Sequence, residues 1–241
     1  PSSGLGHTDR RGNSLSAIAG EKAGIVPTGQ RCAITHPQMP EVMAVLRARC
    51  AEKGVPLRQV EGSALRNRKT PQGQSPAGQS PIGQSPAGQS PAGQWVQYKL
   101  PGGLTLQLET RMLGSFQCYN LAAAVLVARE LKLDGIAIAE GVKNAFWPGR
   151  LEELPGEIPV LLDGAHNPDG MLALMESLGQ FYPKRSPVAI CASGSRKDAG
   201  ATLDAMKDRV ERLFGLPTGA SQATPPEAWA AMARGRGRPP Q

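Results

Sequence analysis

The sequence predicts an α/β fold with two units, and three observations support this prediction. An apolar run at Ile158–Leu162 leads through Asp163–Asn167 into a segment with helical spacing. Strand-like and helix-like segments alternate from His7 to Lys143. A Pro-Gly pair within Trp147–Arg150 forms a hinge between the two regions. The second unit is therefore expected to be Rossmann-like.

The first unit is expected to begin with a capped amphipathic helix at Asn13–Gly24, with Leu15, Ile18 and Ala19 facing inward and Gly24 ending it. Period-2 and period-3.6 patterns predict the elements that follow. In chain order they are a strand at Arg31–Thr35, a helix at Pro40–Lys53 stopped by Gly54, a strand at Leu57–Val60, a half-buried strand through Leu104, Leu106 and Leu108, and helices at Leu121–Leu131 and Ile136–Ala145.

A repeated five-residue unit, Gly-Gln-Ser-Pro-Ala with small variations, occupies Pro71–Gln94. The unit has almost no apolar content, so burial cannot repay the entropy of ordering it. We expect a flexible, solvated insert between two strands, although such arrays also serve as partner-binding motifs. Loop-closure entropy grows slowly with length, so the insert is compatible with the fold.

The second unit contains the most informative stretch of the chain. Asn167 is expected to cap a helix that has Pro168 in its first position. Ligands in doubly wound folds lie beyond the carboxyl ends of the strands, where a helix start also favours anions. Asp163 and His166 are therefore placed to meet a nucleotide or phosphate; the alternative is a capped turn in which they only satisfy backbone donors. A strand at Val188–Ala192, a helix at Thr202–Leu213 and a short helix at Pro226–Ala233 are expected to follow.

Three further segments accompany this turn. They are His7-Thr-Asp-Arg-Arg-Gly-Asn with Lys22 in Glu21-Lys22-Ala23-Gly24-Ile25, Gly114-Ser-Phe-Gln117-Cys-Tyr-Asn120, and Trp147-Pro-Gly-Arg150-Leu-Glu152. Together with Asp163-Gly-Ala-His166-Asn167-Pro168, they resemble the dihydrofolate synthase and folylpolyglutamate synthase family of the Mur ligase superfamily, over roughly residues 5–200. The resemblance implies a partial central ATPase domain at 1–146 with a low-complexity insert at 70–94. An incomplete glutamate-ligase domain at 147–215 and a divergent, largely disordered basic tail at 216–241 would follow.

The resemblance also implies an ATP-dependent ligase that phosphorylates the carboxylate of dihydropteroate or folate and joins the acyl phosphate to the amine of L-glutamate. The cofactors implied are ATP and Mg²⁺. At the metal site, His7 resembles the family's magnesium-binding histidine, and Lys22 resembles the carbamylated lysine that helps to hold a second metal. At the nucleotide site, Gln117 resembles a nucleotide-site residue, Asn120 the asparagine that contacts the base, Arg150 the linker arginine near the phosphates, and Asp163 an aspartate that binds ATP. His166 resembles an active-site histidine, and Lys22 and His166 are the catalytic candidates.

These roles are chemically sensible. Phosphoryl transfer needs positive charge against developing negative oxygens, which Mg²⁺ and Arg150 would supply. A lysine helps to hold a cation only if its charge is removed, and carbamylation of a neutral amine removes it. Lys22 follows Ile18 by four residues and so is expected near the inner face of its helix.

Each residue also has a structural explanation when taken alone. His7 could be a surface histidine, and Lys22 a helix-end charge. Gln117 and Asn120 could cap the helix expected at Leu121. Arg150 could pair with Glu152 or Glu153 at the surface, with little energetic effect.

A Gly-Lys-Ser or Gly-Lys-Thr phosphate loop, which ATP-binding Mur-type ligases need, is absent from these 241 residues. We expect a C-terminal piece of a ligase that shows no ligation alone. The rival hypotheses are a Mur ligase of cell-wall synthesis and a non-catalytic remnant that binds nucleotide or a partner.

The composition and the residue pattern argue against several other classes of protein. The net charge of +7 arises partly from Arg234, Arg236 and Arg238, and with 4% aromatic residues and no binding motif we expect no nucleic-acid partner. No apolar run is long enough to predict a membrane span. The four cysteines, Cys32, Cys50, Cys118 and Cys191, fit neither a zinc site nor a disulfide framework, which favours a reduced, cytoplasmic protein. We expect a monomer whose partners are ATP, L-glutamate and dihydropteroate or folate.

Overall fold

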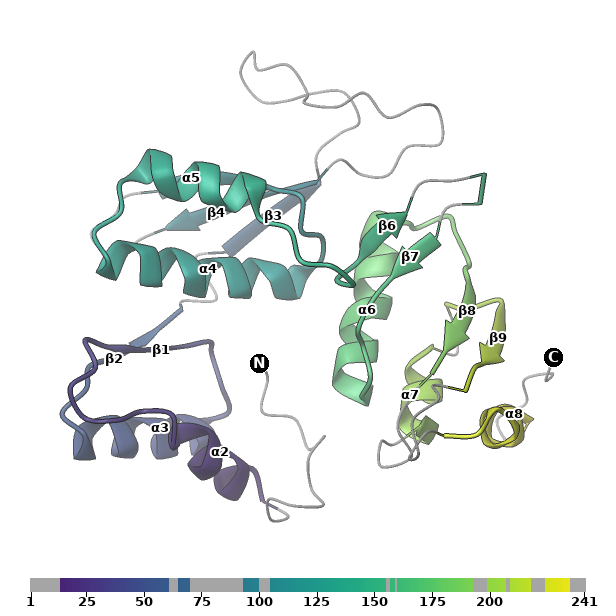
Figure 1. Cartoon of the computed structure of the whole chain (residues 1–241), viewed down its shortest axis with the longest axis horizontal. Coiled ribbons are helices and arrows are strands. Elements are labelled where there is room, and N and C mark those ends of the chain that lie inside the picture. The colour runs from purple at the N-terminus through teal and green to yellow at the C-terminus, as the bar shows by residue number, and fades with distance from the viewer. Residues whose placement is uncertain are drawn as a thin grey trace. The chain divides into compact units, whose positions relative to one another are not determined.

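The structure is a computed structural model that describes residues 14–60, 65–69, 93–99, 105–154, 157–158, 160–192, 199–206, 209–217 and 224–234. The chain divides into two compact units, Pro1–Val160 and Leu161–Gln241. The first contains an α/β part and an antiparallel sheet covered by helices, and the second contains parallel strands with helices (Figure 1). An α/β fold is therefore confirmed, whereas the predicted domain boundary at residue 146 stays a prediction.

Helix α2 (Leu15–Ala23) begins at Ser14, whose hydroxyl accepts a hydrogen bond of 3.1 Å from the amide of Ala17. This cap satisfies one of the amides that a helix start leaves unpaired. Ile18 and Ala19 are buried, as the pattern predicts, and the helix ends at Gly24. The helix begins two residues later than Asn13, because Ser14 rather than Asn13 lies next to its first turn.

A parallel β-α-β arrangement follows. Strand β1 (Ala33–Thr35) leads to helix α3 (Pro40–Glu52), which leads to strand β2 (Leu57–Gln59), and the two strands pair from Ala33 opposite Leu57 to Thr35 opposite Gln59. A proline occupies the start of α3, where its missing amide hydrogen costs nothing. The three predicted elements are confirmed with shorter bounds.

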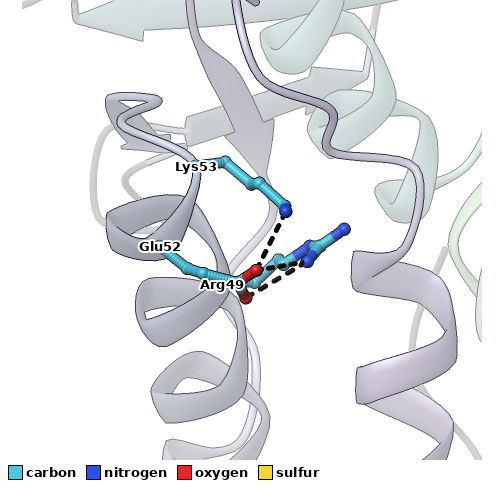
Figure 2. A network of polar contacts seen from close by, with 3 residues as sticks. All are labelled: Arg49, Glu52 and Lys53. Carbon is cyan, nitrogen blue, oxygen red and sulfur yellow. Dashed lines mark hydrogen bonds and ion pairs between the residues drawn. The ribbon is translucent and has the colours of Figure 1, made fainter.

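A polar network closes the last turn of α3 (Figure 2). Arg49 donates to Glu52 at 3.0 and 3.1 Å, and Lys53 lies 2.9 Å from the same carboxylate. The hydrogen bond from Lys53, followed by that from Arg49, lowers the pKa of Glu52. Because Glu52 is exposed to solvent, this network contributes little to stability.

The next three strands form an antiparallel sheet, β3 (Leu65–Lys69), β4 (Gln94–Lys99) and β5 (Thr105–Thr110), in that order. Only β5 was predicted, through Leu106 and Leu108, and Leu104 lies outside the described residues. Lys69 pairs with Gln94, so the insert connects the facing ends of two strands, as expected. Residues 70–92 of the insert lie outside the described residues.

Helices α4 (Ser115–Glu130) and α5 (Gly135–Asn144) contact this sheet. A shared core joins Val96 and Leu108 of the sheet to Leu121 and Val125 of α4. Helix α5 confirms the prediction at Ile136–Ala145, whereas α4 begins six residues before the expected Leu121. Its first turns contain polar residues that obscured the helical pattern.

Strands β6 (Glu152–Leu154) and β7 (Val160–Leu162) form a two-stranded sheet, and the unit boundary falls within β7. The expected strand at Ile158–Leu162 is shorter than predicted, because Ile158 precedes it and is 80% exposed. Helix α6 (Pro168–Phe181) follows β7. Its buried Met171, Met175 and Leu178 pack with Met206 and Val210 in a core cluster of the second unit.

Strand β8 (Val188–Cys191) pairs in parallel with strand β9 (Arg212–Gly215), and helix α7 (Ala199–Met206) lies between them in sequence. The predicted helix at Thr202–Leu213 is therefore wrong over its last part: α7 ends at Met206, because Leu213 and its neighbours extend the sheet beside β8. Lys197 and Asp198 lie outside the described residues.

Helix α8 (Pro226–Arg234) confirms the short helix predicted at Pro226–Ala233. Its Trp229 is buried against Ala199 and Leu203 of α7. Residues 235–241, which include Arg236 and Arg238 of the basic tail, lie outside the described residues. None of the helices within the described ranges is long and apolar enough to cross a membrane.

Candidate functional site

In the turn after β7, two side chains accept hydrogen bonds from backbone amides that follow them in the sequence. Asp163 Oδ1 accepts a hydrogen bond of 2.8 Å from the amide of Ala165, and Asn167 Oδ1 accepts one of 2.8 Å from the amide of Gly170. The Asn167 cap and the Pro168 start of α6 confirm the sequence prediction. The turn therefore presents a helix N-terminus at the carboxyl end of a strand, the place where α/β folds bind anions.

His166 is exposed on this turn, and its Nδ1 lies 2.8 Å from the carbonyl oxygen of Gly164. Because a carbonyl oxygen only accepts hydrogen bonds, Nδ1 carries the proton in the neutral ring. Nε2 is then the acceptor, available to take a proton or to bind a donor. Asp163 is half-buried, and its bond to Ala165 is compatible with either the nucleotide role or the capped-turn alternative.

Gln117 and Asn120 form a hydrogen-bonded amide pair on α4. Nδ2 of Asn120 donates to Oε1 of Gln117 at 2.8 Å, with Gln117 buried and Asn120 exposed. Both residues lie inside the helix, so the alternative that they cap a helix beginning at Leu121 is wrong. The bond engages one Nδ2 hydrogen and leaves the oxygen of the exposed Asn120 suited to the edge of a planar, hydrogen-bonding ligand.

Arg150 is exposed in the Trp147–Arg150 segment, which was predicted to be a hinge and lies within the first unit. The carboxylate of Glu152 accepts a hydrogen bond of 2.7 Å from the amide of Gly149. Leu151, next to Arg150, has a φ of +48° and is buried, so its side chain holds an unfavourable backbone conformation in place. The hinge is therefore a defined turn that fixes where the Arg150 backbone lies.

Lys22 lies half-buried in the last turn of α2. His7, its predicted partner in metal binding, lies outside the described residues. Within those residues, no group of three or more His, Cys, Asp or Glu side chains could hold a metal ion. The described part of the chain thus contributes only Lys22 to the predicted metal site, and both metal assignments stay predictions.

His36, which the sequence analysis did not single out, follows β1 at the carboxyl end of the parallel β1–β2 pair. Its ring lies 6.0 Å, between centroids, from the ring of Tyr119, the neighbour of Asn120 on α4. Burial lowers the pKa of His36. The available signal was its position after the predicted strand at Arg31–Thr35, where ligand-binding side chains gather.

The structure thus brings together Gln117 with Asn120, and Asp163 with His166 on one turn. The pairs belong to different units, and Lys22 and Arg150 lie in the first unit at the end of α2 and in the hinge. The assigned roles of all these residues stay predictions.

Comparison with known proteins finds similarity to one family model and to several folate-related ligases. Residues 149–240 match the family model described as Mur ligase, glutamate ligase domain. The folylpolyglutamate synthase of Lacticaseibacillus casei is 27% identical over 240 residues, which are 96% of this chain and 51% of the relative. The dihydrofolate synthase/folylpolyglutamate synthase of Bacillus subtilis is 29% identical over 187 residues, 74% of this chain and 39% of the relative.

Crystal structures of Mycobacterium tuberculosis folylpolyglutamate synthase complexed with ADP and AMPPCP are also similar, with a TM-score of 0.81 and 26% identity. The similarity covers 97% of this chain and 50% of that one. The chain therefore spans about half the length of the relatives it matches. The comparisons thus show that residues 149–240 match the Mur ligase glutamate ligase domain and that most of the chain is similar, in sequence and in fold, to folylpolyglutamate synthases.

Proposed function

We propose that this chain functions in an ATP-dependent ligase that joins L-glutamate to dihydropteroate, to folate or to both. In the proposed reaction an oxygen of the substrate carboxylate attacks the γ-phosphorus of ATP, and ADP leaves. The amine of glutamate then attacks the carbonyl carbon of the acyl phosphate, loses a proton, and inorganic phosphate leaves. Both steps depend on positioning and on charge stabilisation rather than on a protein nucleophile.

The turn from Asp163 to Gly170 carries this proposal. It combines a carboxylate, an exposed imidazole and the N-terminus of α6 within a few residues. Helix N-termini attract phosphate oxygens, and the Nε2 atom of His166 can accept a proton from an attacking amine. The structures of a relative complexed with ADP and AMPPCP support a nucleotide as the anion.

Each of the other predicted residues has a proposed role of its own. We assign the Gln117–Asn120 pair to the nucleotide base, because amide groups match its donors and acceptors. Arg150 would contact the phosphates from the hinge, since guanidinium groups bind phosphate oxygens with two parallel bonds. His7, and Lys22 in carbamylated form, would hold Mg²⁺, which when bound would offset the charge of the phosphates.

The 241 residues contain no Gly-Lys-Ser or Gly-Lys-Thr loop to hold the transferred phosphoryl group. We therefore expect these residues by themselves to bind adenine nucleotide without ligating glutamate. Binding and ligation are consequently separate parts of the proposal.

Nucleotide binding is tested by calorimetric titration of ADP into the purified chain and its variants. Asn120→Ala and Asp163→Asn should each weaken binding about tenfold, as expected for loss of one well-placed hydrogen bond. Asn144→Ala is a matched control, because among the described residues the hydrogen bonds of this amide are to Glu140 within α5. No binding by the unaltered chain, or equal affinity in all variants, would contradict the proposal.

Ligation is tested by supplying the N-terminal half of the M. tuberculosis relative as a separate polypeptide. Phosphate release that requires ATP, glutamate and dihydropteroate or folate supports the ligase. Phosphate release by the chain alone would refute the expectation that it needs a phosphate loop from elsewhere. Comparing dihydropteroate with folate as sole acceptor decides which carboxylate is used.

A second candidate is a Mur ligase of peptidoglycan synthesis. The UDP-N-acetylmuramoyl-L-alanyl-D-glutamate–2,6-diaminopimelate ligase of Listeria monocytogenes is 33% identical over 101 residues, 39% of this chain. The folate-type relatives match over more of the chain, including 96% for the L. casei protein, which favours the first candidate. Offering a nucleotide-linked muramoyl peptide in the same assay separates the two.

A further inference from the structure

The insert ends in a dipeptide that is fixed in the fold. Glycine followed by glutamine recurs at five-residue intervals through the repeats. The copies are Gly73-Gln74, Gly78-Gln79, Gly83-Gln84, Gly88-Gln89 and Gly93-Gln94. Only the last copy comes immediately before Trp95, and its Gln94 is the first residue of β4.

Gln94 is fully buried, with 0% of its surface exposed. Its Nε2 donates hydrogen bonds to the carbonyl oxygens of Met112 and Gly114 at 2.6 and 3.0 Å. The side-chain oxygen of Gln94 is also buried and has no hydrogen-bond partner among the described residues. The opposite orientation of the amide would place oxygen against two carbonyl oxygens, so the two bonds fix its direction.

Gly93 makes this placement sterically possible. Its φ is +154°, and a β-carbon at this position would collide with the carbonyl oxygen of Thr110. A larger residue therefore cannot bring the chain this close to the end of β5. The pair acts as a unit, in which Gly93 permits the approach and Gln94 makes the bonds.

The two carbonyls that Gln94 holds lie immediately before α4. Gly114 is the N-cap of α4, with a φ of +106° and no side chain to cap the helix. Its carbonyl oxygen also accepts a hydrogen bond of 3.1 Å from the amide of Gln117. Gln117 in turn accepts the bond from Asn120. A continuous series of hydrogen bonds thus runs from Gln94 through Gly114 to the Gln117–Asn120 pair.

We propose that Gln94 is a positioning residue for nucleotide binding: its buried amide fixes the start of α4 and thereby the orientation of Gln117 and Asn120. The last glycine-glutamine copy of the repeats supplies this residue. The inference rests on the proposed nucleotide role of Gln117 and Asn120, but its structural part can be measured without nucleotide.

The first test replaces Gln94 with methionine, which has a similar length and lacks the donor. Amide hydrogen exchange of Gln117 should become at least tenfold faster relative to that of Val125 in the core of α4, because only the start of the helix loses support. ADP should bind about tenfold more weakly, as expected for misplacing the pair.

Deleting Ser85–Gln89 provides a matched control. The deletion removes one whole repeat and leaves a glycine-glutamine pair in front of Trp95. Amide exchange and ADP affinity should equal those of the unaltered chain. If the deletion disturbs them as much as Gln94→Met does, the length of the insert rather than Gln94 controls the site, and the proposal fails.

A second variant, Gln94→Glu, keeps the proposal testable if Gln94→Met does not fold. A protonated glutamic acid can donate one hydrogen bond to the two carbonyls, whereas a carboxylate is repelled by them. Lowering the pH should therefore slow Gln117 exchange, relative to Val125, in this variant more than in the unaltered chain. An equal pH response of both proteins would overturn the proposal.

The outcomes separate this inference from the proposed function. If the unaltered chain binds no ADP, the nucleotide proposal fails, and the inference that Gln94 positions a binding pair fails with it, even where the exchange data show a fixed helix start. If ADP binds but Gln94→Met leaves both its affinity and the Gln117-to-Val125 exchange ratio unchanged, only the role of Gln94 is refuted. Faster exchange of Gln117 and Val125 in equal proportion also refutes it, because Gln94 would then support the whole domain.

Discussion

The indole of Trp229 lies directly against the backbone of Gly215: a β-carbon added to Gly215 would be 2.9 Å from Trp229 Cβ and 3.1 Å from its ring. This approach joins α8 to the last residue of β9. Gly215→Ala should therefore destabilise the second unit by about 1–3 kcal/mol, the usual cost of overpacking. Urea unfolding followed by far-UV circular dichroism measures the change.

Gly141→Ala is the contrasting variant, because its added methyl group would meet nothing within 4 Å in the middle of α5. This variant should gain about 0.5–1 kcal/mol, since alanine loses less backbone entropy than glycine in a helix. Equal stability changes in the two variants would show that the Trp229 contact does not restrict Gly215.

The N-cap of α6 should be separable from the chemistry of its turn. Asn167→Ala removes the acceptor for the amide of Gly170 and should lower stability by about 0.5–2 kcal/mol. Asn167→Asp keeps an acceptor and should restore most of that loss. Thermal unfolding of the three proteins measures the effect, and failure of aspartate to restore stability would argue against the capping role.

Glu130 links α4 to the strand pair of the first unit. Its carboxylate forms an ion pair with Arg58 of β2, while its backbone carbonyl accepts a bond of 2.6 Å from Arg31. Glu130→Gln removes only the ion pair and should cost about 0.5–1 kcal/mol at low salt, because Arg58 is half exposed. A double-mutant cycle with Arg58→Gln isolates the pair; its coupling energy should decrease as salt is added.

His36 should make the stability of the first unit depend on pH. Burial lowers its pKa below the ordinary value of 6.5, so the unfolded chain binds a proton first as the pH falls. Folding stability should therefore decrease as the pH falls below about 6.5, and this part of the pH dependence should be absent in His36→Asn. Urea midpoints between pH 8 and pH 5 test this, and identical profiles for both proteins would contradict it.

Two cysteines should resist alkylation at neutral pH. Burial raises the pKa of Cys118 and of Cys191 to about 11. At pH 8 only about one thiol in a thousand is then the reactive thiolate. Iodoacetamide labelling, followed by mass spectrometry, should be slow at both sites and rise steeply toward pH 10 at the half-buried Cys191. Rapid labelling of Cys191 at pH 8 would contradict this expectation.

Local sequence signals predicted the elements whose pattern and caps agree. Asn167 and Pro168 marked the start of α6, and the apolar spacing around Val42 and Cys50 marked α3. The same reasoning missed β3 and β4, because the repeats separate the two strands and β3 contains a single hydrophobic residue, Leu65. It also extended a helix through Leu213, where pairing with β8 overrides local preference.

The sequence indicated which residues belong to the candidate site, but it did not predict the contacts between them. The motif around Gln117 and Asn120 indicated a ligand, whereas their mutual hydrogen bond depends on both lying within α4, which was expected to begin later. Gln94 belongs to a repeat that predicts no structure, and its role arises from carbonyls eighteen and twenty residues away. Such long-range contacts carry no local sequence signal.

The pairing of Lys69 with Gln94 also has a genetic consequence. The repeated unit is five residues long, so a gain or loss of one unit changes the gene by five whole codons. The reading frame is preserved, and each new allele still encodes the same residues on both sides of the facing strand ends.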